Sequence, residues 1–200
     1  MWRPAHWPAA VGRKGEQMRW DQLFADLEAQ LEAEEARDLM LEVADRTRRE
    51  RALVSLPERL LAHRCAPVTV SLQGGLVVGG DVQDVGLDWL LVQEGVGRTA
   101  LVPLASVLAV SGLTAAVSSG ADARMARRFG FGYALRGVSR DRAVVALVDV
   151  SGATVTGTID AVGADALELS EHPSDLPRRP ENVTARRVVP FTAVAALRTA

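Results

Sequence analysis

The sequence predicts an α+β protein in which a long N-terminal helix precedes two tandem, five-stranded small β-barrels, each introduced by a short helix. Three observations predict this class. The segment before residue 53 is charged and carries apolar residues at helical spacing, the remainder contains an internal repeat, and each copy alternates short apolar runs with glycine turns. This combination is typical of one helix attached to two small β-domains.

The composition is that of a folded protein, with 48% hydrophobic and 24% charged residues. A formal net charge of −2 excludes a strongly basic protein that coats nucleic acid non-specifically. No apolar stretch approaches the roughly 18 to 20 residues of a membrane helix, and no signal-peptide pattern occurs. Cys65 cannot form an internal disulfide, and three scattered histidines supply no metal-ligand set. We therefore expect a cytoplasmic protein with no membrane span, metal or cofactor.

The N-terminal region divides into an unpatterned stretch and a helix. Residues 1–17 carry two prolines and two tryptophans without periodicity, which indicates a disordered or mistakenly included extension. Residues 18–52 predict one long amphipathic helix with acidic residues early and basic residues late, as the helix dipole favours. Its apolar stripe recurs at helical steps: Trp20, Phe24, Leu27 and Leu31. We expect this stripe to bind a protein partner or a second copy; interleaved acids make a DNA-binding helix the weaker alternative.

The most informative feature is an internal repeat in the chain after residue 52. Val68–Val92 aligns without a gap on Val145–Leu169, and the second copy carries ten more residues in the loop that follows. The copies share these positions: Gly75/Gly152, Gly80/Gly157, Val85/Val162, Gly86/Gly163, Asp88/Asp165 and Leu90/Leu167, then the Val-Pro pairs 102–103 and 189–190. Shared glycines and an aspartate at fixed offsets indicate one module that occurs twice, as residues 53–113 and 141–200.

Each copy has the pattern of five short strands separated by turns. Val68, Val70 and Leu72 alternate with polar or small residues, and Gly74-Gly75 and Ser151-Gly152 are typical of hairpin turns. Five short strands bury little as an open sheet. Because closure encloses a core and removes open edges, we expect each copy to form a closed barrel.

A short helix is predicted before each barrel. Ser55 and Glu58 have the spacing of a capping box. Residues 114–140 are predicted to be a linker and a helix over roughly Asp122–Arg136, because a helix also precedes the first copy of the repeat. Gly130 and an alternating apolar pattern favour a strand instead.

The repeated unit resembles the Sm-like barrel, one of the SH3-like folds. The likeness rests on a short helix, the V-x-V-x-L strand, a glycine turn and the G-x-V-x-x-V-G-x-D pattern that begins at Gly80, and it covers Leu56–Leu113 and Asp122–Arg198. It implies assembly through edge strands and binding of uridine-rich RNA. The turns that follow Asp88 and Asp165 lack the asparagine of the family's RNA pocket. The second turns, Leu104-Ala105-Ser106 and Phe191-Thr192-Ala193, lack the family's Arg-Gly pair, so the resemblance implies the fold and not the RNA site.

Over its whole length, the chain is also similar to an uncharacterised actinobacterial family sometimes labelled Fis-type regulators. The segment RWDQLFADLEAQLEAEEARDLMLEVADRTRRERA and the Val-Gly-x-Asp turns carry this likeness. The label implies a C-terminal helix-turn-helix, whereas the sequence here predicts a strand after Val189-Pro190-Phe191.

No catalytic constellation is present in the sequence. His63 and Cys65 have no orienting acid, and the paired aspartates Asp88 and Asp165 are expected to cap tight turns. The loop that distinguishes the second copy contains four candidate partner-binding residues: Arg178, Arg179, Arg186 and Arg187. We therefore expect a non-enzymatic interaction or scaffold protein that binds a protein partner or forms a homo-oligomer, without a small-molecule substrate. The alternative is a nucleic-acid-associated regulator that binds RNA or acts in transcription.

Overall fold

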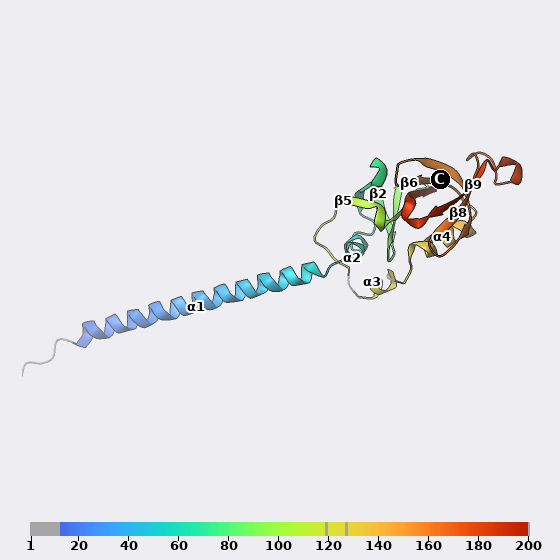
Figure 1. Ribbon diagram of the computed structural model, residues 1–200. Coiled ribbons are helices and arrows are strands. Elements are labelled where there is room, and N and C mark those ends of the chain that lie inside the picture. The colour runs from blue at the N-terminus through green and yellow to red at the C-terminus, as the bar shows by residue number, and fades with distance from the viewer. Residues whose placement is uncertain (1–12, 119, 127, 200) are drawn as a thin grey trace, which may run out of the picture. The chain divides into compact units, whose positions relative to one another are not determined.

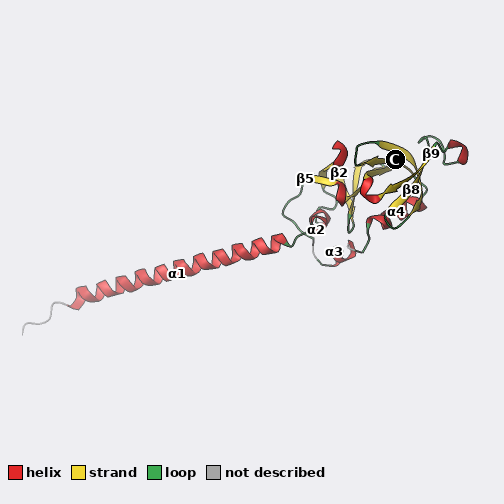
Figure 2. Cartoon of the chain, in the orientation of Figure 1, coloured by secondary structure: helices red, strands yellow, loops and turns green. Residues whose placement is uncertain are grey.

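The computed structural model describes residues 13–118, 120–126 and 128–199, with the backbone alone described for residues 13–21. The chain divides after Leu53 into two units. The first contains the helix α1, Arg13–Ala52 (Figure 1). The second contains all the strands and the remaining helices (Figure 2). An α+β chain that begins with a long helix is therefore confirmed.

Helix α1 is longer than the sequence predicted. It begins at Arg13, so residues 13–17, which the sequence assigned to the extension, are helical; residues 1–12 lie outside the described residues. Gly15 is the only glycine in the helix and there is no proline, while its many Glu, Arg, Leu and Ala residues are good helix formers. Exposed ion pairs such as Arg46–Glu50 (3.1 Å) add a few tenths of a kcal/mol each.

Ten antiparallel strands form one continuous sheet in the order β5-β1-β2-β3-β4-β10-β6-β7-β8-β9. The first half of the sheet contains β1 Pro67–Leu72, β2 Val77–Val85, β3 Trp89–Gly95, β4 Arg98–Pro103 and β5 Val107–Ser111. The second half contains β6 Val144–Asp149, β7 Thr154–Val162, β8 Ala166–Glu171, β9 Ala185–Pro190 and β10 Val194–Thr199.

The two halves have the same topology. In each, the fifth strand pairs with the first, and the first four pair in sequence. Even the irregularities recur: the register shifts between Val82 and Asp84 on β2, and between the aligned residues Ile159 and Ala161 on β7. The repeat in the sequence is therefore also a repeat of strand order and register.

The prediction that each half closes into its own barrel is wrong, because the sheet is not closed. The outer edge of β4 pairs with β10 of the other half, in the register Leu101↔Leu197. This pairing leaves β5 and β9 as the two ends of the sheet. Alternation and turn residues predicted the strands, but they carry no information about which strand edges meet.

Each half nevertheless has its own hydrophobic core. The first core contains Val70, Val78 and Leu90 with Leu60 of α2 (Leu56–Leu61). The second is built around the following residues: Phe131 and Leu135 of α4 (Phe131–Arg140), Leu147, Ile159 and Leu167. Strand β10 contributes to both, since Ala196 packs in the first core and Leu197 in the second.

The two short helices predicted from the sequence are only partly as expected. At the start of α2 the predicted capping box is present, because the Ser55 N–H donates to the Glu58 carboxylate at 2.9 Å. The single helix predicted over Asp122–Arg136 is instead two helices, α3 (Ala121–Ala126) and α4. Glycine precedes the first residue of α4 and offers no capping side chain.

A side chain from the first half caps α4 of the second half. The Phe131 N–H at the start of α4 donates to Asp88 Oδ1 at 2.6 Å. A carboxylate accepts this otherwise unsatisfied donor and also suits the positive end of the helix dipole. The sequence predicted that Asp88 caps its own turn; its side chain instead links the two halves.

We expect Asp88→Ala to lower the free energy of unfolding by about 1 kcal/mol, because α4 loses its cap. Urea denaturation followed by circular dichroism measures this change. Asp165→Ala, at the aligned and exposed position in the second half, is the matched control and is expected to change stability by less than about 0.5 kcal/mol. Equal losses in the two variants would contradict the capping role.

Candidate interaction surfaces

The first candidate surface is helix α1. Three of the four stripe residues predicted from the sequence, Phe24, Leu27 and Leu31, are exposed, and the Trp20 side chain lies outside the described part. Further large apolar residues on α1 are also exposed: Leu23, Leu39, Met40, Leu41 and Val43. Since Leu39, Met40 and Leu41 are consecutive, they lie on different sides of the helix. The apolar surface is therefore wider than the predicted narrow stripe.

The apolar surface of α1 is surrounded by negative charge. Between residues 22 and 45, the sequence has eight carboxylates and one arginine. These side chains are exposed, so they set the sign of the electrostatic potential around the apolar residues. Such a surface favours a partner that combines apolar side chains with positive charge.

The second candidate surface is the loop between β8 and β9. Its Arg178 side chain forms an ion pair within the sheet unit. Arg178 Nη2 donates to Asp160 Oδ2 at 2.7 Å, and Arg178 Nε lies 2.6 Å from Asp160 Oδ1. Ser170, which is fully buried, donates its hydroxyl to the same carboxylate at 2.5 Å. Arg178 therefore anchors the loop to β7 through a largely covered ion pair.

The charge state of Asp160 is set by these contacts. Burial acts to raise the pKa of Asp160, but the hydrogen bonds from Arg178 and Ser170 and the positive charges of Arg178 and Arg142 outweigh it and lower that pKa below its ordinary value. The same pair raises the pKa of Arg178. Both groups are thus charged at neutral pH.

The other three predicted arginines differ in availability. Arg187 on β9 is paired with Glu171 of β8. Arg179 lies 4.0 Å from Glu181 with both side chains well exposed, a contact that contributes little. Arg186 on β9 is exposed, and no ion pair joins it to the described side chains. Two of the four arginines are therefore used within the fold, and Arg179 and Arg186 remain accessible to a ligand.

The third candidate surface is the pair of sheet ends. The resemblance to Sm-like barrels implied assembly through edge strands, but the sequence analysis named no residue of these ends as a candidate. Among the described residues, β5 pairs only with β1 and β9 only with β8. Leu108 on β5 and Val188 on β9 are largely exposed. A groove of about 360 Å³ beside β9 is lined mainly by Leu147, Val155, Leu169, Val188 and Val189. The repeat contained a signal for this surface: Val188 aligns with Leu101, an apolar residue of the first half that is buried.

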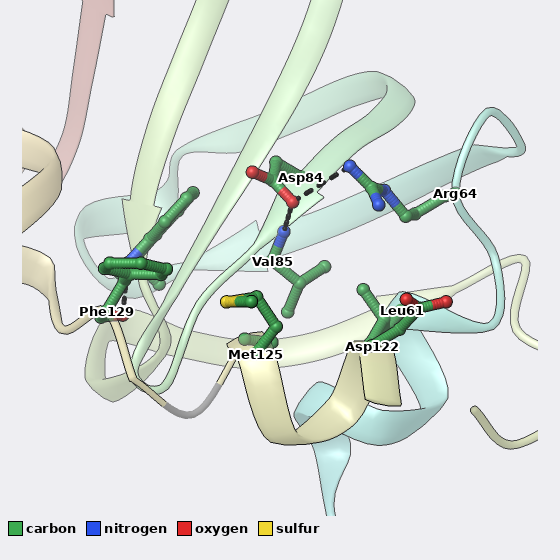
Figure 3. Close-up of a pocket in the computed structure, with 9 residues that line it drawn as sticks. Leu61, Arg64, Asp84, Val85, Asp122, Met125 and Phe129 are labelled. Atoms are coloured by element: carbon green, nitrogen blue, oxygen red, sulfur yellow. Dashed lines mark hydrogen bonds and ion pairs between the residues drawn. The ribbon is translucent and has the colours of Figure 1, made fainter. Parts of the chain in front are cut away.

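A smaller pocket of about 200 Å³ lies where α3 meets the first half of the sheet (Figure 3). The Arg64–Asp84 ion pair (3.2 Å) lies on one side and Phe129 on the other. Trp89 is buried, and its Nε1–H donates to the Phe129 carbonyl at 2.9 Å. Arg64 and Asp84 bind each other, the Trp89 Nε1–H is used by the Phe129 carbonyl, and the remaining charged lining residue is Asp122 of α3, so the pocket presents no converging set of donors to a ligand.

No catalytic arrangement occurs among the described residues. The His63 ring lies within hydrogen-bond distance of the Arg59 carbonyl and of Thr114, and the buried His172 ring contacts Thr158 Oγ1 at 2.9 Å. Cys65 is exposed. Residues 13–118, 120–126 and 128–199 contain no group of three or more His, Cys, Asp or Glu side chains placed to hold a metal ion. The titratable groups of the sheet unit thus serve mainly its own hydrogen bonding.

We expect Asp160→Asn to lower the free energy of unfolding at pH 7 by about 1 to 3 kcal/mol, because a charged hydrogen-bond acceptor is lost. The pKa of Asp160 is lowered in the folded state, so its contribution is complete above the unfolded value of about 3.9 and declines as the pH falls through the folded value. The difference between wild type and variant should therefore shrink below about pH 4.

Urea unfolding at pH 7 and at acid pH checks this prediction. Asp175→Asn removes an exposed carboxylate from the same loop and serves as the control, with no expected change. A difference between wild type and Asp160→Asn that stays constant through the acid range would refute the role of the charged pair.

The described residues include no helix that is both long and apolar enough to span a membrane. Comparison with models of known protein families, with curated protein sequences and with solved structures gives no match. The function is therefore argued from the surfaces of the chain itself.

Proposed function

We propose that this chain is a non-enzymatic, cytoplasmic interaction protein that binds a protein partner through α1. We further propose that each half of its sheet is a Sm-like, SH3-like module. The shared strand order of the two halves and a helix ahead of each first strand support this assignment. In this proposal the double module is a rigid scaffold that carries the partner-binding helix.

The observation that carries the proposal is the apolar surface of α1. Eight large apolar side chains between Leu23 and Val43 are 47% to 72% exposed. Burial of one such side chain contributes about 1.5 to 3 kcal/mol, so covering even a few of them against a partner gives substantial binding energy. The surrounding carboxylates favour a partner segment that is basic as well as apolar.

Replacing apolar side chains of α1 by charged ones in the full chain tests the proposal. We expect Leu27→Glu with Leu31→Glu to abolish capture of a protein partner from cell lysate after nuclease treatment. Ala29→Glu with Ala33→Glu adds the same charge to the same exposed helix without removing a large apolar side chain, and it should retain capture. Equal capture by both double variants would contradict the proposal.

The second candidate function is that of a nucleic-acid-associated regulator. The exposed Arg179 and Arg186 in the second half of the sheet favour it. A labelled single-stranded RNA would then shift in a gel in a salt-dependent way, and Arg179→Ala with Arg186→Ala would reverse the shift. We expect no such shift at physiological salt; a shift that these two substitutions remove would replace the protein-binding proposal.

A further inference from the structure

Helix α1 carries a second apolar face, nearly opposite the stripe that the sequence predicted. This second face is formed by the following residues: Ala29, Ala33, Ala36, Met40, Val43 and Thr47. We propose that it binds the second face of another copy of the chain, so that two α1 helices pair antiparallel. The predicted stripe, where we place the protein partner, stays uncovered in such a pair. Since the inference concerns a different face of α1, it does not rest on the function proposed above.

The geometry of the helix separates the two faces. An α-helix turns by about 100° per residue, so residues at steps of three and four lie on one side. Phe24, Leu27 and Leu31 therefore share one side, and Met40 and Val43 lie roughly 180° around the helix from them. Met40 is 72% exposed and Val43 is 56% exposed. The breadth of the apolar surface on α1 thus comes from two faces, which use different halves of the helix.

The second face has the spacing of a helix-pairing surface. Its six residues follow one another at steps of four, three, four, three and four. Alternating steps of three and four keep one side of a helix turned toward a partner helix that runs beside it. The first five residues are exposed, and the half-buried Thr47 uses its hydroxyl to donate to the Val43 carbonyl at 2.8 Å. The whole face is therefore compatible with an apolar contact.

The order of small and large residues on the second face favours an antiparallel pair. Because the spacing is the same in both directions, Ala33 would lie opposite Val43 of the second copy, and Ala36 opposite Met40. Each layer then combines one alanine with one larger side chain, so the distance between the helices stays even. A parallel pair would place alanine against alanine at one end and Met40 against Met40 further along, which requires two different distances.

The residues that flank the second face fit the same arrangement. Leu39, which is 62% exposed, would lie beside the two-fold axis and contact Leu39 of the second copy. Glu32 and Arg46 lie on this same flank, and the register places Glu32 of each copy next to Arg46 of the other. Arg46 also lies 3.1 Å from Glu50 of its own helix, but both side chains are well exposed, so that pair leaves room for a second carboxylate.

The distribution of charge along α1 favours the same direction. Residues 22–36 carry five carboxylates and no basic residue, whereas residues 46–51 carry four arginines and one glutamate. Antiparallel helices bring the acidic segment of each copy toward the basic segment of the other, whereas parallel helices bring like charges together. Arg37 would lie near Arg37 of the second copy, a like-charge contact that costs little at an exposed rim.

Burial of apolar side chains supplies the binding energy of the pair. Leu39, Met40 and Val43 are its large apolar residues, and each is covered twice because both copies contribute them. The second face covers fewer than about three heptads, which is short for a stable coiled coil. We therefore expect association that depends on the concentration of the chain.

Light scattering on the full chain over a concentration series tests the second face. The mass of the wild type should rise toward that of a dimer, and Met40→Glu with Val43→Glu should raise the dissociation constant by at least about tenfold. The control Leu27→Glu with Leu31→Glu adds the same charge to the opposite side and should associate as the wild type does. All four residues are exposed in one chain, so both double variants should fold, which circular dichroism checks.

Two outcomes of this experiment would overturn the proposal. One is a wild type that stays monomeric throughout, as expected if a helix of a different protein covers the second face. The other is a dimer that persists in Met40→Glu with Val43→Glu, as expected if another surface of the chain carries the association.

An exchange of charges tests the register. Glu32→Arg alone and Arg46→Glu alone should each raise the dissociation constant by about threefold or more, because two attractive contacts in each pair become repulsive. The double variant Glu32→Arg with Arg46→Glu should restore association to the wild-type level, because the same contacts form with their signs reversed. A double variant that associates no better than the single variants would overturn the proposal.

Cysteine cross-linking in a Cys65→Ser background tests the direction of the helices. A mixture of Ala33→Cys chains and Val43→Cys chains should form mixed disulfide dimers, and neither variant alone should form its own. Disulfides within one variant alone, as expected for parallel helices, or none in the mixture, would overturn the proposal.

The two faces of α1 are distinguished by their own pairs of substitutions. Leu27→Glu with Leu31→Glu should lose capture of the protein partner and keep self-association. Ala29→Glu with Ala33→Glu should keep capture and lose self-association, because both alanines belong to the second face. Loss of self-association in the first double variant, or wild-type self-association in the second, would overturn the pairing through the second face, whatever the result for capture.

Discussion

The antiparallel pairing of β4 with β10 is the contact on which the architecture of the sheet unit depends. It joins two five-stranded modules into one sheet and seats the adjacent residues Ala196 and Leu197 in different hydrophobic cores. Because successive side chains of a strand point to opposite faces, one strand can complete two cores in this way. The two modules are therefore coupled through shared packing as well as through backbone hydrogen bonds.

Polar side chains in the sheet unit mainly reinforce this arrangement. Asp88 links a turn of the first module to α4 of the second, and Arg198 links β10 to Glu94 of β3. Asp160 and Arg178 fasten the long loop of the second module to its own sheet. Helix α1 carries many exposed charged groups without such roles, and it is where we place the partner-binding surface.

The sequence predicted the elements far better than their association. Alternating apolar residues and glycine turns identified both sets of five strands, and the Ser55–Glu58 spacing identified the start of α2. Barrel closure was predicted wrongly, because strand edges present the same backbone groups whichever strand they face. The cap on α4 was missed for a similar reason: Asp88 and Phe131 are brought together by the fold, not by local spacing. On α1 the sequence predicted a narrow apolar stripe, whereas the exposed large apolar residues are spread more widely around the helix.

The dual role of β10 also bears on how the protein acquires its structure during synthesis. Thr99 and Thr199, which meet across the junction, are 100 residues apart in the chain. When β4 leaves the ribosome, its outer edge and the space later filled by Ala196 are still uncovered, and they stay so until β10 follows. The first module therefore passes through a period in which a nascent chain carries an open, apolar strand edge, the kind of surface that chaperones bind.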